Sequence, residues 1–212
     1  MPSWCAPSPL PNPVLTPRLE VRAYTSADAP ALFDAVARDR QALLPWLPWA
    51  GFAHQNEQET AEFLRDCQAR AASSEAPDFT MGVFLRTDGT LVGGTGLHAI
   101  RPAVGEAEIG YWITASHRRR GLCVEATAAL ISAALTPAAE GGWGLRRIVI
   151  SCAALNVGSV GVCTRLGLRR EAVRRGDRWF EGHGSQPPGY IDSHTYAVLA
   201  DEWDTTAHRR LE

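Results

Sequence analysis

The chain of 212 residues has no lysine, so its 21 residues of the Lys and Arg class are all arginine, against 23 acidic residues. A formal net charge of -2 argues against a general nucleic-acid binder, because such proteins usually carry a clear basic excess. No apolar run is long enough to cross a bilayer, and the first residues lack the charged start and apolar core of a signal peptide. We therefore expect a cytoplasmic protein that does not associate with membranes.

The sequence also lacks closely spaced metal ligands and the cysteine pattern of a disulfide framework. The five cysteines are odd in number, scattered and without C-x-x-C spacing, which argues against disulfides and against a zinc site. The six histidines show no ligand spacing either. We therefore expect no bound metal and a reducing compartment, which fits the cytoplasm.

Two parts can be distinguished along the chain. Residues 1–17 contain six prolines and little apolar content, which predicts an extended, poorly ordered leader. Residues 18–212 have the length of one ordinary domain that can bury a good core. We therefore predict a single domain behind a proline-rich leader.

Hydrophobic patterns in this domain predict an α/β (α+β) fold with helices around a central sheet of about seven strands. Strands are expected at 18–24, 79–86, 91–100, 107–114, 146–152, 169–175 and 190–199, and helices at 29–40, 57–72, 122–135 and 156–166. Gly93, Gly94 and Gly96 fail as a dinucleotide motif, because no third glycine follows at the required spacing and no helix opens there. We expect them to mark a bulge or a close approach within a strand.

The stretch 106–135 reads as a strand, an arginine-rich turn and a helix. In the strand, one face is apolar, and the other carries Glu106, Glu108, Gly110 and Trp112. The turn Arg118-Arg119-Arg120-Gly121 enters a helix whose first N–H groups lack partners within the helix. The helix dipole, the arginines and a glycine that lets a ligand approach the backbone predict a seat for a phosphorylated cofactor. The alternative is a solvated arginine loop.

Two tryptophans lie between prolines in the segment 43–49. Trp46 and Trp49 are thereby presented on a stiffened segment, and indole rings give a large contact area with little rotamer entropy to lose. We interpret them as walls of an acceptor pocket. The alternative is a hydrophobic lid over the core.

Several motifs in fixed order resemble the GCN5-related N-acetyltransferase family. The shared pattern is a strand, an R-x-x-G-x-C turn, a long helix, an apolar strand, an N-x-x-S helix start and Leu166-Gly167. Details at 16–19, 46–49, 108–113, 125–126 and 196–203 resemble the RimJ/RimL-like branch that includes ribosomal-protein alanine N-acetyltransferases. The resemblance spans 16–203. Two positions depart from the family pattern, because Cys123 stands where glycine or alanine is usual and Leu168 replaces an aromatic residue.

The resemblance implies an acetyl-CoA-dependent N-acetyltransferase whose mixed sheet splays in a V between the fourth and fifth strands. Acetyl-CoA would lie in the gap between the strand that ends at Ile113 and the strand that starts at Arg146. Backbone groups of Ile113 and Thr114 would bind the pantetheine arm, and Asn156 would reach the same arm. The N–H groups that would hold the pyrophosphate belong to Arg118, Arg119, Arg120, Gly121, Leu122, Cys123 and Val124.

Acetyl transfer requires a deprotonated amine. Deprotonation at pH 7 costs about 4.6 kcal/mol for a lysine side chain but only about 1 kcal/mol for an α-amine, so an N-terminus needs modest help. Glu108 is the first candidate to take this proton, directly or through water, and Glu106 is the second. The alternative for Glu108 is a structural ion pair with an arginine. The resemblance implies that Ser159 stands where the family places a hydroxyl that protonates the departing thiolate, with helix-start hydrogen bonding as the alternative. Glu125 is expected to complement the helix dipole.

The acceptor side of the site is expected to include Trp46, Trp49, Glu106 and Trp112. The preferred acceptor is a protein or peptide N-terminal α-amine, and a small amine such as an antibiotic or an aminoacyl nucleotide is the alternative. From a different class, the chain could be a non-catalytic acyl-CoA sensor. The sequence leaves the oligomeric state open, a homodimer included.

Overall fold

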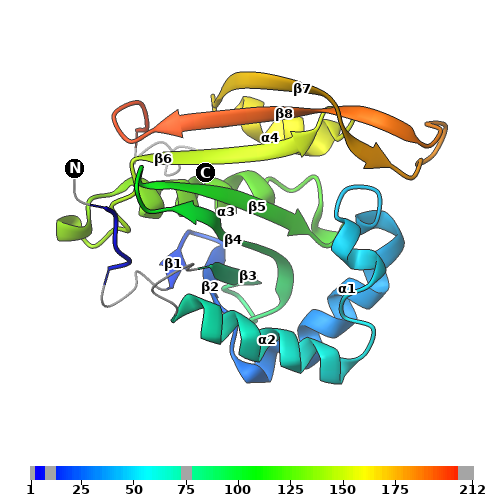
Figure 1. The fold of residues 1–212 in the computed structure, drawn as a ribbon. Helices are drawn as coiled ribbons and strands as arrows, with labels where there is room; N and C mark the ends of the chain where they lie inside the picture. Colours follow the sequence, from blue (N-terminus) through cyan, green and yellow to red (C-terminus); the bar gives the residue numbers. More distant parts are fainter. Residues whose placement is uncertain (1–2, 8–12, 73–77, 205–212) are drawn as a thin grey trace.

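The computed structural model describes residues 3–7, 13–72 and 78–204, and its centre is one mixed sheet (Figure 1). The strands run in the order β1-β2-β3-β4-β5-β6-β8-β7, and all neighbours are antiparallel except β5 and β6. Their bounds are β1 Val14–Leu15, β2 Leu19–Ala23, β3 Phe79–Leu85, β4 Leu91–Arg101, β5 Glu106–Ile113, β6 Arg147–Ala153, β7 Arg169–Phe180 and β8 Gly189–Leu199. The predicted fold class is confirmed, with the short β1 added to the seven expected strands.

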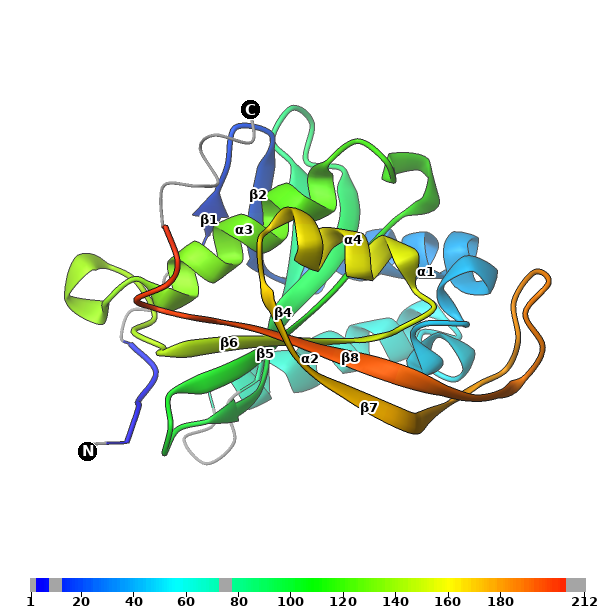
Figure 2. The same ribbon diagram turned by 90° about the horizontal axis from the view of Figure 1, so that it is seen from above.

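Helices cover both faces of this sheet (Figures 1 and 2). On one face lie α1 (Ala29–Leu43) and α2 (Glu57–Ala71), and on the other lie α3 (Leu122–Leu135) and α4 (Val157–Arg165). Short 3-10 segments occur at Ser26–Asp28, Pro48–Gly51, Ala115–His117 and Ala138–Glu140. Within the described ranges, we find no helix with the length and apolar character needed to cross a membrane.

The largest difference from the predicted elements is at β7. We predicted a strand that ends at residue 175, but β7 continues to Phe180 and pairs with the start of β8, for example through Trp179 and Tyr190. Nearly all side chains of β7 are exposed, so this hairpin is held mainly by backbone hydrogen bonds. A strand without a buried face shows no alternation of polar and apolar residues, and sequence patterns therefore missed its second half.

The helix α3 lies at the centre of the core. Twelve of its 14 residues are buried, because it packs against the sheet and against α4. Its Leu130 and Ile131 share the main hydrophobic cluster with Ile109 of β5 and Ile148 of β6, and each such side chain contributes roughly 1.5–3 kcal/mol on burial. This packing fixes the first turn of α3 relative to β5 and β6.

The parallel strands β5 and β6 diverge after three residues. Residues 106–108 of β5 pair with residues 147–149 of β6, and the described structure has no register between these strands beyond Glu108 and Val149. Meanwhile β6 pairs with β8 along its whole length. The predicted V-shaped splay is therefore confirmed, between the fourth and fifth of the expected strands.

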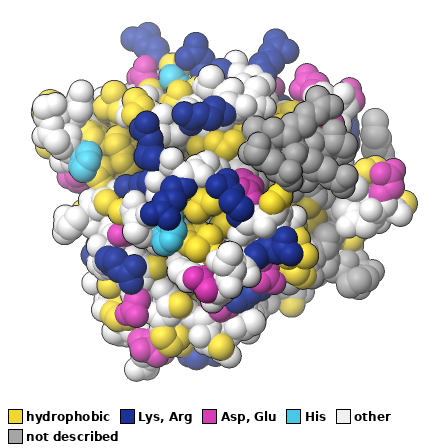
Figure 3. Space-filling view, turned by 180° about the vertical axis from the view of Figure 1, so that it is seen from behind, with side chains coloured by type: hydrophobic (Ala, Val, Ile, Leu, Met, Phe, Trp, Pro, Cys, Tyr) yellow, Lys and Arg dark blue, Asp and Glu magenta, His cyan; other side chains and the backbone are white. Residues whose placement is uncertain are grey.

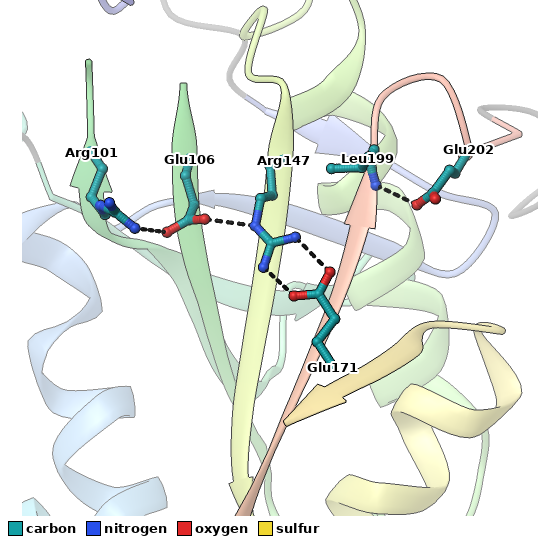
Figure 4. Close-up of polar contacts among 6 residues, drawn as sticks. All are labelled: Arg101, Glu106, Arg147, Glu171, Leu199 and Glu202. Atoms are coloured by element: carbon teal, nitrogen blue, oxygen red, sulfur yellow. Dashed lines mark hydrogen bonds and ion pairs between the residues drawn. The ribbon is translucent and has the colours of Figure 1, made fainter. Parts of the chain in front are cut away.

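An ion-pair network closes the joined end of the splay (Figure 4). Glu106 accepts hydrogen bonds from Arg101 Nη1 at 3.0 Å and from Arg147 Nε at 2.7 Å. Arg147 also donates two hydrogen bonds to the carboxylate of Glu171. Because Glu106 holds β4, β5 and β6 together, the structure gives it a structural role in place of the acceptor and proton roles that we considered.

Parts of the leader pack on the domain. Val14 and Leu15 form β1 against β2, and Trp4 donates from Nε1 to the Trp143 carbonyl at 2.7 Å and from its N–H to the Pro102 carbonyl at 2.8 Å. The expectation of a poorly ordered leader is wrong for these residues, because an indole and a short strand find partners that the proline content did not reveal. Residues 1–2 and 8–12 lie outside the described ranges.

Glu125, in the first turn of α3, ties the end of the leader to this helix. The carboxylate is buried and accepts hydrogen bonds from Thr16 Oγ1 at 2.5 Å, the Arg18 N–H at 3.1 Å and Arg18 Nε at 2.6 Å. Its place in the first turn fits the expected interaction with the helix dipole. The contacts with the leader explain why this carboxylate is buried.

Glu125→Gln is expected to lower the free energy of unfolding by about 1–3 kcal/mol, because the amide nitrogen that replaces Oε2 is a donor and cannot accept the hydrogen bond from Arg18 Nε, and the ion pair with Arg18 is lost. The loss stays below that of a fully buried ion pair, since the Arg18 side chain is 48% exposed and can be solvated. Urea unfolding measures the change. The matched control is Glu62→Gln, which removes an exposed i,i+3 pair with Arg65 and should change stability by less than about 0.5 kcal/mol. Equal effects of the two substitutions would contradict a role for Glu125 in fixing α3.

Candidate active site

The turn between β5 and α3 has the geometry of an anion site. Arg118 donates from Nε to the Ile113 carbonyl at 3.0 Å, which holds the turn against the end of β5. Arg119 (φ 64°) and Gly121 (φ 80°) then take left-handed conformations before the helix begins at Leu122. Left-handed residues in such a turn direct successive backbone N–H groups toward one point, which favours a bound anion.

The first N–H groups of α3 are open. No side chain caps this helix start, and the N–H groups of Leu122, Cys123 and Val124 have no hydrogen-bond acceptor in the described part of the chain. The next N–H group, from Glu125, donates to the Gly121 carbonyl at 3.0 Å. On the face that carries α3 and α4, arginine side chains surround an apolar area (Figure 3). Open N–H groups, the helix dipole and nearby cations together suit a diphosphate.

Cys123 places a small, uncharged side chain at this helix start. Burial raises the pKa of its thiol to about 12, so the side chain is neutral at physiological pH. Cysteine is also small. The replacement of the family's usual glycine or alanine therefore leaves the N–H groups accessible to an anion.

The two residues expected to contact the pantetheine arm differ in their free backbone groups. Thr114 donates its N–H to the Val92 carbonyl at 2.8 Å, and its carbonyl accepts from the His117 N–H at 2.9 Å, so both groups are used. Successive N–H groups of a strand point to opposite sides, so the N–H of Ile113 is directed toward the splay. The structure therefore favours Ile113 for this contact and does not support Thr114.

Across the splay, the start of α4 is linked to β5 through two hydroxyl groups. Asn156 caps α4 as expected, with its Oδ1 accepting from the Ser159 N–H at 3.1 Å. The Ser159 hydroxyl lies 2.9 Å from the Tyr111 hydroxyl. Burial raises the pKa of Tyr111, so the phenol keeps its proton. Strand alternation had assigned Tyr111 to the core, and sequence patterns gave no sign of this contact between two elements.

A cavity of about 430 Å³ lies between α1, α2 and the strands β3 to β5. This volume is within the range of small-ligand pockets, roughly 300–1,000 Å³. Its walls include Tyr24, Phe63, Trp49 and Trp112, and the two indole rings meet edge to face with centroids 6.3 Å apart. The cavity lies on the face of the sheet opposite α3.

The floor of this cavity consists of glycines on β4 and β5. A β-carbon at Gly94 would lie 2.5 Å from Trp112 Nε1, and one at Gly96 would lie 2.6 Å from His98 Nε2, so neither position has room for a side chain. At Gly110 the nearest atom would be 3.7 Å away. The close-approach role expected for Gly94 and Gly96 is confirmed, and Gly94 and Gly110 line the cavity.

Of the four residues expected on the acceptor side, the structure brings two together. Trp49 and Trp112 line the cavity. Trp46 stacks on Phe180 of β7 with ring centroids 5.5 Å apart, so it holds the segment after α1 against the β7–β8 hairpin. Glu106 belongs to the network at the joined end of the splay.

Glu108 lies beside the cavity with an unpaired carboxylate. No hydrogen bond or ion pair to it occurs within the described residues, so the alternative of a structural ion pair finds no partner here. Its neighbour across the sheet is His98 of β4. The His98 Nδ1 is 3.0 Å from Asp78 Oδ2, and both residues line the cavity. Sequence patterns missed this pair, because its members are 20 residues apart and only the pairing of β3 with β4 joins them.

The sequence profile described as "Acetyltransferase (GNAT) domain" matches residues 18–169. The chain belongs to this acetyltransferase family. It is accordingly an acetyl-CoA-dependent N-acetyltransferase, and the matched residues include the splay, the anion site and α4.

Related proteins cover nearly the whole chain. A protein of Escherichia coli (strain K12) named "Ribosomal-protein-serine acetyltransferase" is 27% identical over 183 residues, which are 86% of this chain and 93% of that protein. The "Putative ribosomal N-acetyltransferase YdaF" of Bacillus subtilis (strain 168) is 25% identical over 186 residues, 88% of this chain and 93% of its own length. A solved structure of RimL, a "Ribosomal L7/L12 alpha-N-protein acetyltransferase" in complex with coenzyme A, superposes with a TM-score of 0.77 at 24% identity, covering 90% of this chain and 98% of that one.

Proposed function

We propose that this acetyltransferase transfers the acetyl group of acetyl-CoA to the N-terminal α-amine of a protein or peptide. The observation that carries the proposal is the glycine-floored cavity with indole walls, which meets β5 where the splay begins. The name of the E. coli relative, a ribosomal-protein-serine acetyltransferase, supports the same class of acceptor. An extended N-terminal residue fits a narrow site of this kind, because flat aromatic walls contain a chain without a large entropic cost.

The coenzyme would bind in the splay. Its pyrophosphate would accept hydrogen bonds from the N–H groups of residues 122–124, with the exposed Arg119 and Arg120 beside it. Each charge–dipole interaction of this kind contributes roughly 0.3–1 kcal/mol. Ile113 on β5 and Asn156 at the start of α4 would contact the pantetheine arm from the two sides of the splay.

Acetyl transfer needs a proton acceptor near the amine and a proton donor near the sulfur. The unpaired Glu108 on the cavity face of β5 is proposed to receive the proton of the amine, directly or through an intervening group. Ser159, which is hydrogen-bonded to Tyr111, is proposed to protonate the thiolate on the other side of the thioester. An α-amine requires only about 1 kcal/mol for deprotonation at pH 7, so one weak base is sufficient.

The charges around the cavity favour a peptide over an aminoacyl nucleotide. A nucleotide would bring a phosphate group, which proteins usually bind with several cationic or N–H donors. Among the residues that line the cavity, Arg70 is the single permanently cationic side chain. Its guanidinium lies 5.9 Å from the centre of the Phe63 ring, against the aromatic wall.

The test is a screen of acetyl-CoA consumption with peptides that differ in their first residue and with a panel of small amines. A peptide with a free N-terminus should react at least about 100-fold faster than the same peptide with a blocked N-terminus and an internal lysine, because the lysine amine costs about 3.6 kcal/mol more to deprotonate. Mass spectrometry locates the acetyl group. Equal rates with the blocked peptide, or transfer to small amines alone, would overturn the proposed acceptor.

A further inference from the structure

His98 and Asp78 form a hydrogen-bonded pair inside the acceptor cavity. Asp78 immediately precedes β3, and its Oδ2 is 3.0 Å from His98 Nδ1, while its Oδ1 accepts from Thr80 Oγ1 at 3.0 Å. Burial tends to raise the pKa of Asp78, but the hydrogen bonds and the charge of His98 outweigh burial and lower it. An ionised carboxylate can only accept, so Nδ1 carries the hydrogen and the Nε2 of the neutral ring keeps a free lone pair.

The free Nε2 lies where the cavity meets the splay. The ring folds back over the glycine floor, since a β-carbon at Gly96 would be 2.6 Å from Nε2 and one at Gly110 would be 4.0 Å from it. On the cavity face of β5, Gly110 is the first residue after the last pair between β5 and β6, at Glu108 and Val149. An amine directed toward the splay from this cavity would therefore pass Nε2.

The strand β4 carries a bulge directly after His98. The register of β4 with β5 passes from His98 opposite Glu108 to Arg101 opposite Glu106, three steps on one strand against two on the other, so β4 carries one extra residue. Ala99 in this bulge has a φ of 47°, a left-handed conformation that costs a non-glycine residue roughly 1–2 kcal/mol. Bulges of this kind commonly redirect a side chain beside a functional site.

Glu108 of β5 is the cross-strand neighbour of His98. It lies directly across the sheet from His98, where β-carbons are roughly 4.5–5.5 Å apart, but it is not among the residues that line the cavity. We propose that His98, oriented by Asp78, takes the proton from the acceptor amine, and that Glu108 acts on the amine through His98. This inference rests on the proposed acetyl transfer.

In the proposed transfer, one proton of the amine passes through His98 and the other through Ser159. The ammonium group gives one proton to His98 Nε2, and the resulting amine attacks the carbonyl carbon of the thioester. The C–S bond breaks, its electron pair leaves with sulfur, and the thiolate takes a proton from the Ser159 hydroxyl. The second proton lost by the nitrogen restores that hydroxyl. The imidazolium then releases its proton to solvent, so each acetyl transfer releases one proton.

Two carboxylates lie beside the ring. Asp78 faces Nδ1, and Glu108 faces the ring from β5. On α2, Arg70 and Cys67 lie behind Asp78, and burial raises the pKa of the Cys67 thiol, which is therefore neutral. The charged groups around the ring are therefore these two carboxylates and, behind Asp78, the guanidinium of Arg70.

The test compares His98→Ala, Asp78→Asn and Glu108→Gln by the pH dependence of kcat/KM, using whichever amine the wild type acetylates fastest. His98→Ala should lower kcat about 100-fold or more, as loss of a general base does. It should also remove the fall in rate at acidic pH, and added imidazole should restore part of the activity. Asp78→Asn and Glu108→Gln should lower kcat but keep the acidic fall, since both leave the His98 imidazole in place. His183→Ala, on the β7–β8 hairpin, is the control and should leave the profile unchanged.

Coenzyme A binding by calorimetry reports whether each variant is folded, and His98→Gln replaces His98→Ala if the smaller side chain destabilises the protein. A near-normal kcat in His98→Ala would overturn the proposal. The proposal would also be overturned if His98→Ala lost activity but kept the fall in rate at acidic pH and was not rescued by imidazole. Removal of the acidic fall by Glu108→Gln alone would assign the proton to Glu108. A wild type that acetylates only small amines refutes the peptide acceptor but leaves the His98 test intact.

Discussion

Gly121→Asp is expected to weaken coenzyme A binding at least about 100-fold, which corresponds to about 2.7 kcal/mol. The residue immediately precedes the open N–H groups of residues 122–124, so a carboxylate at this position would compete with the pyrophosphate for those groups and repel it. Loss of one or two charge-assisted hydrogen bonds, at about 1.5–3 kcal/mol each, accounts for an effect of this size. Calorimetric titration with coenzyme A measures it.

Gly167→Asp is the matched control for this substitution. Gly167 has a φ of 68°, close to the 80° of Gly121, so the new side chain meets a similar backbone strain. It follows the end of α4, and no heavy atom lies within 4 Å of its β-carbon position. Coenzyme A affinity should stay within about twofold of the wild type, since no phosphate is expected there. Equal losses in both variants would point to backbone strain, and unchanged affinity in Gly121→Asp would exclude α3 as the pyrophosphate site.

The turn and helix start that we propose for the cofactor could be read from the sequence as local structure, because their determinants are local. A left-handed glycine, the arginines before it and an apolar helix after it are consecutive in the chain, and the structure keeps them in that arrangement. The cap of α4 by Asn156 is local in the same sense. Thr114 departs from the expectation because its partners, Val92 and His117, depend on how the turn closes.

The acceptor side was harder to predict from the sequence, because similar residues acquire different partners only in the folded sheet. Glu106 and Glu108 are two residues apart on one strand face, but only Glu106 lies between Arg101 and Arg147. Trp46 and Trp49 likewise differ: Trp46 precedes the 3-10 segment Pro48–Gly51 and stacks on Phe180 of the hairpin, whereas Trp49 lies within that segment and lines the cavity.

The catalytic geometry that we propose also depends on long-range pairing. The contact between Asp78 and His98 requires β3 to pair with β4, and the contact between Tyr111 and Ser159 requires α4 to cross the open splay. No hydrophobic period or motif spacing encodes such contacts. The sequence did indicate parts of the cavity: Gly94 marked a close approach within a strand, and Trp49 and Trp112 were expected on the acceptor side.

Gly110→Val should reduce kcat/KM for the acceptor about 100-fold or more while coenzyme A affinity and stability stay near wild type. Gly110 is exposed and lies on the cavity face of β5, and its β-carbon would make only an ordinary contact, 3.7 Å from His98 Cδ2. Valine is well suited to a strand, so the fold should tolerate it. Its methyl groups would occupy the space between the floor and the imidazole, and a displacement of the amine by about 1 Å costs on the order of 100-fold in rate. Gly110→Ala should give a smaller loss in the same steady-state assay.

The control is Gly189→Val at the start of β8, where no heavy atom lies within 4 Å of the β-carbon position. It adds the same side chain to a strand outside the cavity, so kcat/KM should be unchanged. A graded loss from alanine to valine at Gly110, with none at Gly189, would show that volume in the cavity limits the reaction. Normal turnover in Gly110→Val would exclude the amine from this floor, and the proposed proton transfer to His98 would then be excluded as well, because both require the amine to pass between Gly110 and the imidazole ring.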